Sequence, residues 1–215
     1  MTRNASASPR RTEAPARPGP PPQPPPPSPS PTDRLLGTPD DILATRAGEG
    51  DEEAFATLVR RHSRPLLAMA FHTLGNAQDA EDAVQDAFIS AWRRLPEFRH
   101  ASAFSTWMYR ITANRCLNSL RRRPAPVPLD SVAALAAPGM RSSPVRSAEQ
   151  DALTDALVHA LGALEPRQRL CWILRELHGL SYAEIAQVTG TTEQTVRGRL
   201  FRARRSLKEA LSSWR

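Results

Sequence analysis

The sequence has few cysteines, one lysine and no long apolar run. Its two cysteines, Cys116 and Cys171, stand apart without a Cys-x-x-Cys or Cys/His cluster, which excludes a disulfide framework and argues against a zinc site. No apolar run approaches the ~20 residues of a membrane helix, and the N-terminus lacks the apolar core of a signal peptide. We therefore expect a cytoplasmic protein without membrane insertion.

The sequence also lacks any recognisable catalytic or metal-binding pattern. Its histidines have no metal-ligand spacing, and no nucleophile or acid–base constellation is visible around them. They are His62, His72, His100, His159 and His178. We therefore predict no enzyme activity, no metal and no cofactor.

What the sequence does have is positive charge, with a net charge of +7 and a pI near 10.7. Lys208 is the only lysine, so the excess is arginine. Arginine forms bidentate contacts with phosphate and guanine, and contact with phosphates releases condensed counterions. A nucleic-acid partner is therefore expected, although a GC-rich genome would produce the same arginine bias.

Proline divides the chain into segments. Residues 1–31 contain 12 of the 21 prolines and no aliphatic pattern that could form a core, so we interpret residues 1–38 as a disordered tail. Such a tail is a solvated extension, the product of a mis-assigned start codon, or an arm that binds an aromatic-lined groove. Residues 124–148 contain five prolines and form a predicted flexible linker.

Helical periodicity fills the remaining two blocks, 39–123 and 149–215. In the first block, Phe55, Leu58 and Val59 begin an apolar stripe, and Pro65 should kink that helix. No segment alternates with period two. The sequence thus predicts an all-α protein with two small helical domains joined by the linker.

The second block contains a predicted helix-turn-helix. Ser181 and Glu184 have capping-box spacing, Gly190 ends the first helix, and the run from Thr191 to Gln194 repeats the cap before a second helix. Two capped helices joined by a glycine turn are typical of this DNA-binding motif.

The second helix of this motif has two contrasting sides. At 100° per residue, Val196, Leu200, Ala203 and Leu207 share a predicted buried stripe. The opposite side carries base- and phosphate-binding groups, with a glycine that costs ~1 kcal/mol in a helix. That side consists of Gln194, Arg197, Gly198, Phe201, Arg202 and Arg205. The alternative is a solvated basic face on an ordinary bundle.

A second nucleic-acid face is predicted on the helix that begins near Ser102. Its core side should be Tyr109, Ala113, Cys116 and Leu120. Aromatic, amide and guanidinium groups point the other way and suit unstacked bases. They are Trp107, Arg110, Asn114, Asn118 and Arg121. Alternatively, Trp107 packs under the preceding loop and the asparagines are solvated.

A third surface is acidic in this basic protein. Asp79, Asp82 and Asp86 share a helix face beside Glu81 and Gln85. Carboxylates in a first helical turn are favoured by the helix dipole, which is sufficient for Asp79 and Asp82. Asp86 lies beyond that turn, so it indicates a basic protein partner.

Three stretches together resemble the extracytoplasmic-function (ECF) sigma factors of bacterial RNA polymerase. "DAEDAVQDAFISAWRRLPEFR" is similar to the polymerase-docking segment of that family, and "FSTWMYRITANRCLNSLRRR" to its minus-10 recognition and melting helix. "GLSYAEIAQVTGTTEQTVRGRLFRARRSL" is similar to its minus-35 helix-turn-helix. The resemblance covers residues 40–123 (region 2) and 149–211 (region 4).

The resemblance implies roles and partners. Phe98, Arg99 and Ser102 would hold a flipped-out base, and Asn114 and Asn118 would contact minus-10 bases. Arg197, Gly198, Phe201 and Arg202 would contact the minus-35 element. The acidic surface with Asp79, Asp82, Gln85 and Asp86 would dock on the polymerase clamp helices. Core polymerase, including the flap of its β subunits, and promoter DNA would be the partners of a nucleoid-associated protein. An anti-sigma factor would be a further partner implied by the resemblance.

The linker limits how the two blocks reach both promoter elements. As a flexible coil its 25 residues span roughly 25–30 Å, whereas the two elements lie ~50 Å apart. Only a linker held near its ~80 Å extended length allows simultaneous contact, which the polymerase would provide. The main alternative function is a stand-alone helix-turn-helix regulator, and an enzyme carrying a helix-turn-helix is the third.

Overall fold

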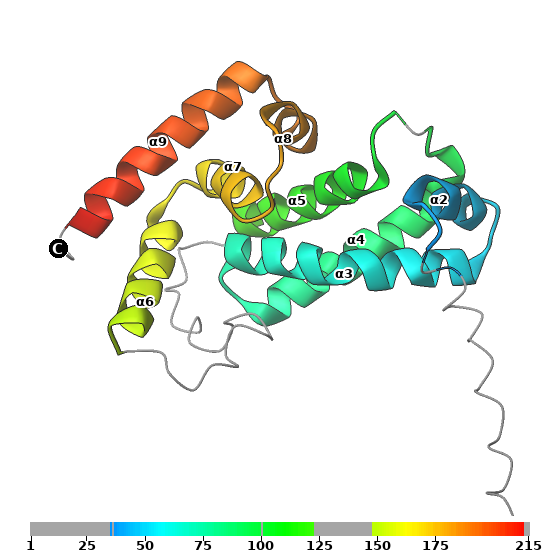
Figure 1. Cartoon of the computed structure of the whole chain (residues 1–215), viewed down its shortest axis with the longest axis horizontal. Helices are drawn as coiled ribbons and strands as arrows, with labels where there is room; N and C mark the ends of the chain where they lie inside the picture. The colour runs from blue at the N-terminus through cyan, green and yellow to red at the C-terminus, as the bar shows by residue number, and fades with distance from the viewer. Residues whose placement is uncertain (1–34, 36, 100, 123–147, 213–215) are drawn as a thin grey trace, which may run out of the picture.

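The computed structural model describes residues 35, 37–99, 101–122 and 148–212, with side chains in the last range described from Ala156 onward. All regular elements in these residues are helical, which confirms the predicted all-α class (Figure 1). The predicted tail and linker lie almost entirely outside the described residues.

The first helical block is a bundle around one core. Its elements are α2 (Asp40–Gly48), α3 (Glu52–Leu74), α4 (Ala77–Arg94), the 3-10 turn η1 (Leu95–Glu97) and α5 (Phe104–Arg122). Asp51 and Asn76 cap α3 and α4 by accepting from the backbone N–H of Ala54 and Asp79. Helix α3 runs through Pro65 and ends at Gly75, whose left-handed φ of 73° suits glycine.

Charged side chains attach α2 to this bundle. The carboxylate of Asp40 pairs with Arg61 and, at 2.7 Å, with His62 Nε2, both on α3. Arg61 also donates to the carbonyl of Thr38 at 3.1 Å. The start of α2 is thereby fixed to the middle of α3.

The second helical block contains the helix-turn-helix. Its helices are α6 (Ala148–Ala163), α7 (Pro166–Glu176), α8 (Tyr182–Thr189) and α9 (Glu193–Leu211). The capping box between Ser181 and Glu184 is present, and Gly190 ends α8 with a φ of 61°. The cap of α9 is Thr192, whose side chain accepts from the N–H of Thr195. The prediction of a cap at Thr191 was wrong by one residue, because the glycine turn uses Thr191 to bond back to the carbonyl of Ala186.

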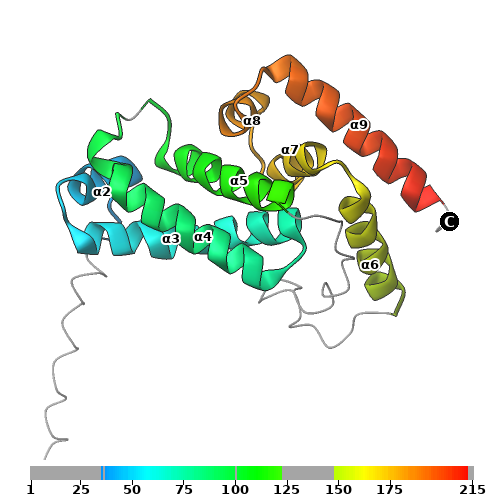
Figure 2. The same ribbon diagram turned by 180° about the vertical axis from the view of Figure 1, so that it is seen from behind.

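The two blocks pack against each other. Helix α5 lies beside α7 and α8 in both views (Figures 1 and 2). Met69 of α3 and Ala113 of α5, both fully buried, belong to one apolar cluster with Leu170 and Leu174 of α7. Ala113 is buried, as predicted, but in the cluster that the two blocks share. The periodicity of one helix cannot show which neighbour covers each face.

Candidate nucleic-acid and protein interfaces

Helix α9 has the two sides that its sequence predicts. Val196, Leu200, Ala203 and Leu207 are all buried. The opposite side is exposed, except that Gly198 is half-buried; its other members are Gln194, Arg197, Phe201, Arg202 and Arg205. The Phe201 side chain is 69% exposed, a large apolar ring without a packing role in this chain. The helix thus offers one continuous surface to a partner.

Gly198 has no steric reason to be glycine within this chain. A Cβ atom there would meet only the Nη1 atom of Arg202 at 3.6 Å, an ordinary van der Waals contact. Because glycine costs about 0.5–1 kcal/mol in a helix relative to alanine, its presence calls for another reason. Close approach of a bound molecule to the α9 backbone supplies one.

Tyr182 is a part of this surface that the sequence reasoning missed. The guanidinium carbons of Arg175 and Arg197 lie 5.2 and 5.9 Å from the centre of its ring. The tyrosine borders an open hollow of about 340 Å³ with Phe201 and four basic side chains, Arg197, Arg204, Arg205 and Lys208. Its place directly after the cap of α8 was the available signal, since the first helix of this motif crosses the DNA backbone.

Three arginines of α9 are paired with carboxylates in solvent. Arg197 lies 3.7 Å from Glu193, Arg204 lies 2.7 Å from Glu176, and Arg205 lies 2.9 Å from Glu209. Hydrogen bonds to these carboxylates raise the pKa of Arg204 and Arg205 above the ordinary value. Exposed pairs of this kind contribute little to stability, so phosphate oxygens can replace the carboxylates at small cost.

Helix α5 exposes the amide groups that were predicted to contact bases. Arg110, Asn114 and Asn118 are exposed, and Asn118 accepts a hydrogen bond from Arg121. The amide of Asn118 therefore lies beside a guanidinium. These groups can hydrogen-bond to base edges without any rearrangement of the core.

The predicted orientation of Trp107 was wrong. Its ring is half-buried, 4.7 Å from the ring of Phe98 and 5.9 Å from that of Phe104. The tryptophan thus packs under the preceding loop, because that loop places Phe98 over α5. Arg99 is exposed and Ser102 half-buried on the same loop, and α5 begins at Phe104 instead of Ser102.

Tyr109 was likewise predicted in the core and is instead half-buried at the contact with the second block. Its hydroxyl lies 2.9 Å from Nδ1 of His178, which follows α7. Leu120, the last predicted core residue of α5, is also only half-buried, whereas Cys116 is fully buried.

The predicted docking residues divide over two flanks of α4. Asp82 and Gln85 are exposed, Asp79 is half-buried near the helix cap, and Asp86 is 61% exposed and lies 3.6 Å from Arg115 of α5. Asp86 therefore faces α5, whereas Gln85 borders a groove on the α3 side. A partner on α4 would have to span the ridge between them.

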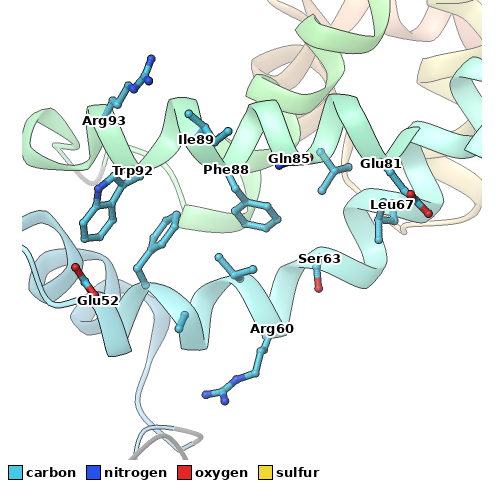
Figure 3. Close-up of a pocket in the computed structure, with 14 residues that line it drawn as sticks. Glu52, Arg60, Ser63, Leu67, Glu81, Gln85, Phe88, Ile89, Trp92 and Arg93 are labelled. Carbon is cyan, nitrogen blue, oxygen red and sulfur yellow. The ribbon is translucent and has the colours of Figure 1, made fainter. Parts of the chain in front are cut away.

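That groove was not predicted from the sequence. It is an open, mostly apolar hollow of about 1000 Å³ between α3 and α4 (Figure 3). Phe88 and Trp92 point into it from α4, and Phe55 lies 4.8 Å from Trp92. Phe55 and Val59, which belong to the predicted apolar stripe of α3, are half-buried here because that stripe is wider than the core.

The two buried cysteines have thiols that stay protonated, as is typical of cysteines with a structural role. Burial raises the pKa of the Cys116 thiol to about 12 and also raises that of Cys171. Neither is a thiolate near neutral pH. Across residues 35, 37–99, 101–122 and 148–212, the structure brings no three His, Cys, Asp or Glu side chains together as a metal site. No helix in the same part of the chain is both long and apolar enough to span a membrane.

Two family models match the chain. Residues 58–124 match Sigma-70 region 2, and residues 154–207 match Sigma-70, region 4. The RNA polymerase sigma-H factor of Pseudomonas aeruginosa is 36% identical over 180 residues, which cover 80% of this chain and 93% of that protein. The ECF RNA polymerase sigma factor SigM of Mycobacterium tuberculosis is 38% identical over 164 residues, which cover 75% of this chain and 79% of that protein.

Solved structures give the same result. CnrH in complex with the cytosolic domain of CnrY is similar with a TM-score of 0.62 and 31% identity, over 81% of this chain and 97% of that one. The sigma factor RpoE of Bartonella quintana, in complex with the anti-sigma factor NepR, has a TM-score of 0.56 and 28% identity. The match covers 75% of this chain and 98% of that one. The chain belongs to the ECF sigma factors of bacterial RNA polymerase. The region 2 match sets aside the stand-alone regulator.

Proposed function

We propose that the two blocks divide the work of promoter-specific transcription initiation. As a sigma factor, the chain binds core RNA polymerase and directs it to promoters. In our proposal α9 recognises the minus-35 element as duplex, while α5 and the loop before it hold minus-10 bases out of the stack. The observation that carries this proposal is the pair of exposed faces with different chemistry, arginines on α9 and amides on α5.

The upstream contact would use Arg197 and Arg202 for base or phosphate oxygens, with Phe201 against a thymine methyl group. Gly198 would admit the DNA backbone, and Gln194 and Arg205 would flank these contacts. Tyr182 would support Arg197 through the contact between its ring and the guanidinium. The hollow beside Tyr182 has the basic lining that a phosphate needs.

The downstream contact would use Asn114 and Asn118 for base edges and Arg110 for the backbone. Unstacking a base costs a few kcal/mol, and hydrogen bonds to the extruded base offset that cost. Phe98 and Trp107 would form the apolar floor beside a flipped base, with Arg99 and Ser102 at its rim. The half-buried position of Trp107 suits such a floor, because one face of the ring is already packed.

Docking on core polymerase would use the exposed side of α4, with Asp82, Gln85 and Asp86 on the clamp helices. Asp79 would contribute mainly to the start of α4. The groove between α3 and α4 lies beside Gln85 and offers an apolar surface for an anti-sigma factor. One similar structure is a complex with the anti-sigma factor NepR, and another is a complex with the cytosolic domain of CnrY. We expect the protein to act without catalysis or a cofactor, at the nucleoid.

Four alanine variants test the division of work. Arg197→Ala and Arg202→Ala should weaken closed-promoter binding about 5- to 150-fold, which corresponds to ~1–3 kcal/mol for a bidentate contact, yet open a pre-melted template nearly normally. Asn114→Ala and Asn118→Ala should bind the closed promoter almost normally and fail at strand opening. A pre-melted bubble should rescue them only in part, because the lost base contacts stay lost.

The measurement is a gel-shift and permanganate-reactivity comparison with core polymerase on intact and bubble templates. Circular dichroism checks that each variant is folded, and Arg64→Ala, exposed on α3, serves as an arginine control. Normal strand opening by both asparagine variants would refute the role given to α5.

A further inference from the structure

The contact between the two blocks has an apolar centre and a polar edge. Its centre contains Met69 and Ala113 from the first block with Leu170 and Leu174 from the second. At the edge, the buried guanidinium of Arg169 donates to the carbonyl of Thr73 at the end of α3, at 2.8 Å. Closing this contact holds α5 directly against the helix-turn-helix.

Three titratable side chains meet at this contact. Tyr109 of α5 is hydrogen-bonded to Nδ1 of His178, at 2.9 Å, and their ring centres are 5.4 Å apart. His72 of α3 lies close enough to His178 to lower its pKa by charge repulsion. The Nε2 atom of His178 is buried and has no hydrogen-bond partner among the described residues.

The surroundings of His178 disfavour a positive charge. Burial, together with His72, lowers the pKa of His178 from 6.5 to about 4, and burial also lowers the pKa of His72. Burial raises the pKa of Tyr109 to about 12, so its hydroxyl stays neutral. Arg175 of α7 donates to the carbonyl of Leu180, and Glu176, the carboxylate at the end of α7, is paired with Arg204 of α9. No carboxylate in the described part of the chain contributes to the shift of His178.

We propose that His72, Tyr109 and His178 form a proton-sensitive lock, which holds the two blocks together near neutral pH and releases them when the cytoplasm acidifies. The doubly protonated His178 ring has to donate from Nδ1 to the oxygen of Tyr109 and carries a positive charge into a buried site. Its Nε2–H has no acceptor among the described residues, and a protonated His72 repels the charge. Both costs disappear when the blocks separate and the rings enter water.

The direction of the effect follows from proton linkage. In the closed form His178 has a pKa near 4, and in the open form its pKa returns to the ordinary 6.5. The closed form therefore binds fewer protons, and lowering the pH from about 6.5 toward 4 favours the open form. At pH 5.5 His178 alone should raise the open-to-closed ratio about tenfold relative to pH 7.5, and His72 acts in the same direction.

Opening matters for the function proposed above, on which this step rests. Two blocks in direct contact cannot reach elements ~50 Å apart, so the closed form has to open before both are contacted. The lock would make the fraction of competent sigma factor depend on pH. The test below measures opening without polymerase or DNA, so its failure would leave the sigma-factor proposal intact.

Thiol accessibility measures opening directly in the full chain. Ala113→Cys places a thiol at a fully buried position of the contact. Its labelling by dithiodipyridine, located by mass spectrometry, is compared with that of Ser206→Cys on the exposed side of α9. The normalised rate reports the open fraction even when that fraction is small. Cys116, buried in the core cluster of the first block, reports unfolding instead of opening.

We expect the normalised rate at Ala113→Cys to rise at least about tenfold from pH 7.5 to 5.5 while Cys116 stays protected. The double variant His72→Asn and His178→Asn should lose this rise, whereas His159→Asn, exposed on α6, should keep it. An equal rise in the double variant, or no rise in the parent, would overturn the lock. So would an NMR titration of His178 in the unaltered chain with a midpoint above 6.

Discussion

Helices α5 and α9 both present candidate DNA-binding groups, but their surroundings differ. Helix α9 buries a single stripe, and its other sides are exposed. Helix α5 is covered on one side by its own block and on another by the helix-turn-helix, and Asn114 and Asn118 lie on the side that stays open. An exposed helix suits rigid duplex, whereas a helix backed by a packed core suits bases that must be held against restacking.

The charges of the two helices differ in the same sense. The outer side of α9 is built from arginines, whose contacts with phosphates are salt-dependent. On the open side of α5, the neutral amides of Asn114 and Asn118 lie between Arg110 and Arg121. We therefore expect the salt dependence of promoter binding to come mainly from α9. The following variants would break or sharpen this contrast, in order of decreasing effect.

The largest effect is expected when a buried residue and an exposed residue of α9 are truncated in turn. Leu200 is buried and Phe201 is exposed, so Leu200→Ala should lower the free energy of unfolding by about 2–5 kcal/mol. Phe201→Ala should change it by less than about 0.5 kcal/mol while weakening promoter binding. Urea unfolding and gel shifts measure the two quantities. A large loss of stability in Phe201→Ala would mean that its ring has a packing role.

A smaller effect on stability is expected in the aromatic cluster before α5. Trp107→Ala removes the contacts with Phe98 and Phe104 and should cost about 1–3 kcal/mol, less than a fully buried ring. It should also impair strand opening, whereas Asn114→Ala should impair opening at unchanged stability. Thermal unfolding combined with permanganate reactivity separates the two. Equal stability of both variants would show that Trp107 is not packed.

The acidic side of α4 should affect polymerase binding and leave the fold unchanged. Asp86→Arg reverses an exposed charge 3.6 Å from Arg115 and should weaken binding to core polymerase about tenfold, ~1.4 kcal/mol. Loss of an exposed ion pair should lower the free energy of unfolding by only ~0–1 kcal/mol. Competition against a labelled sigma factor gives the affinity, with Asp41→Arg on α2 as the matched control. Equal binding by both variants would remove Asp86 from the interface.

The smallest expected effect on stability has the opposite sign. Gly198→Ala should stabilise α9 by about 0.5–1 kcal/mol, because the added Cβ meets open space apart from Arg202. The same methyl group should weaken duplex binding if the DNA backbone approaches this position. Paired unfolding and gel-shift measurements decide the point. Unchanged binding together with higher stability would leave the glycine without a functional reason.

Much of the fold could be predicted because its signals are local. The capping box at Ser181, the glycine turn at Gly190 and the buried stripe of α9 depend on residues three or four apart, and all are present. The exposed side of α9 could then be predicted, because it consists of residues that lie opposite the buried stripe. Among the expected site residues, those on exposed helix surfaces lie where the periodicity placed them, because one helix defines its own faces.

The rest depended on contacts between distant segments. Trp107 packs against Phe98 because of the path of a loop, and the α3–α4 groove exists because two helices do not fully cover each other's apolar residues. Periodicity marks an apolar side but not the neighbour that covers it. For Tyr109 and Ala113 that neighbour is the second block, more than fifty residues along the chain, and the meeting of Tyr109 with His178 is decided by tertiary packing alone. The sequence by itself thus determined the helices and their polar sides, because hydrogen bonds and side-chain spacing within a helix are local. Only the tertiary structure decided which sides are open, because burial depends on what packs against them.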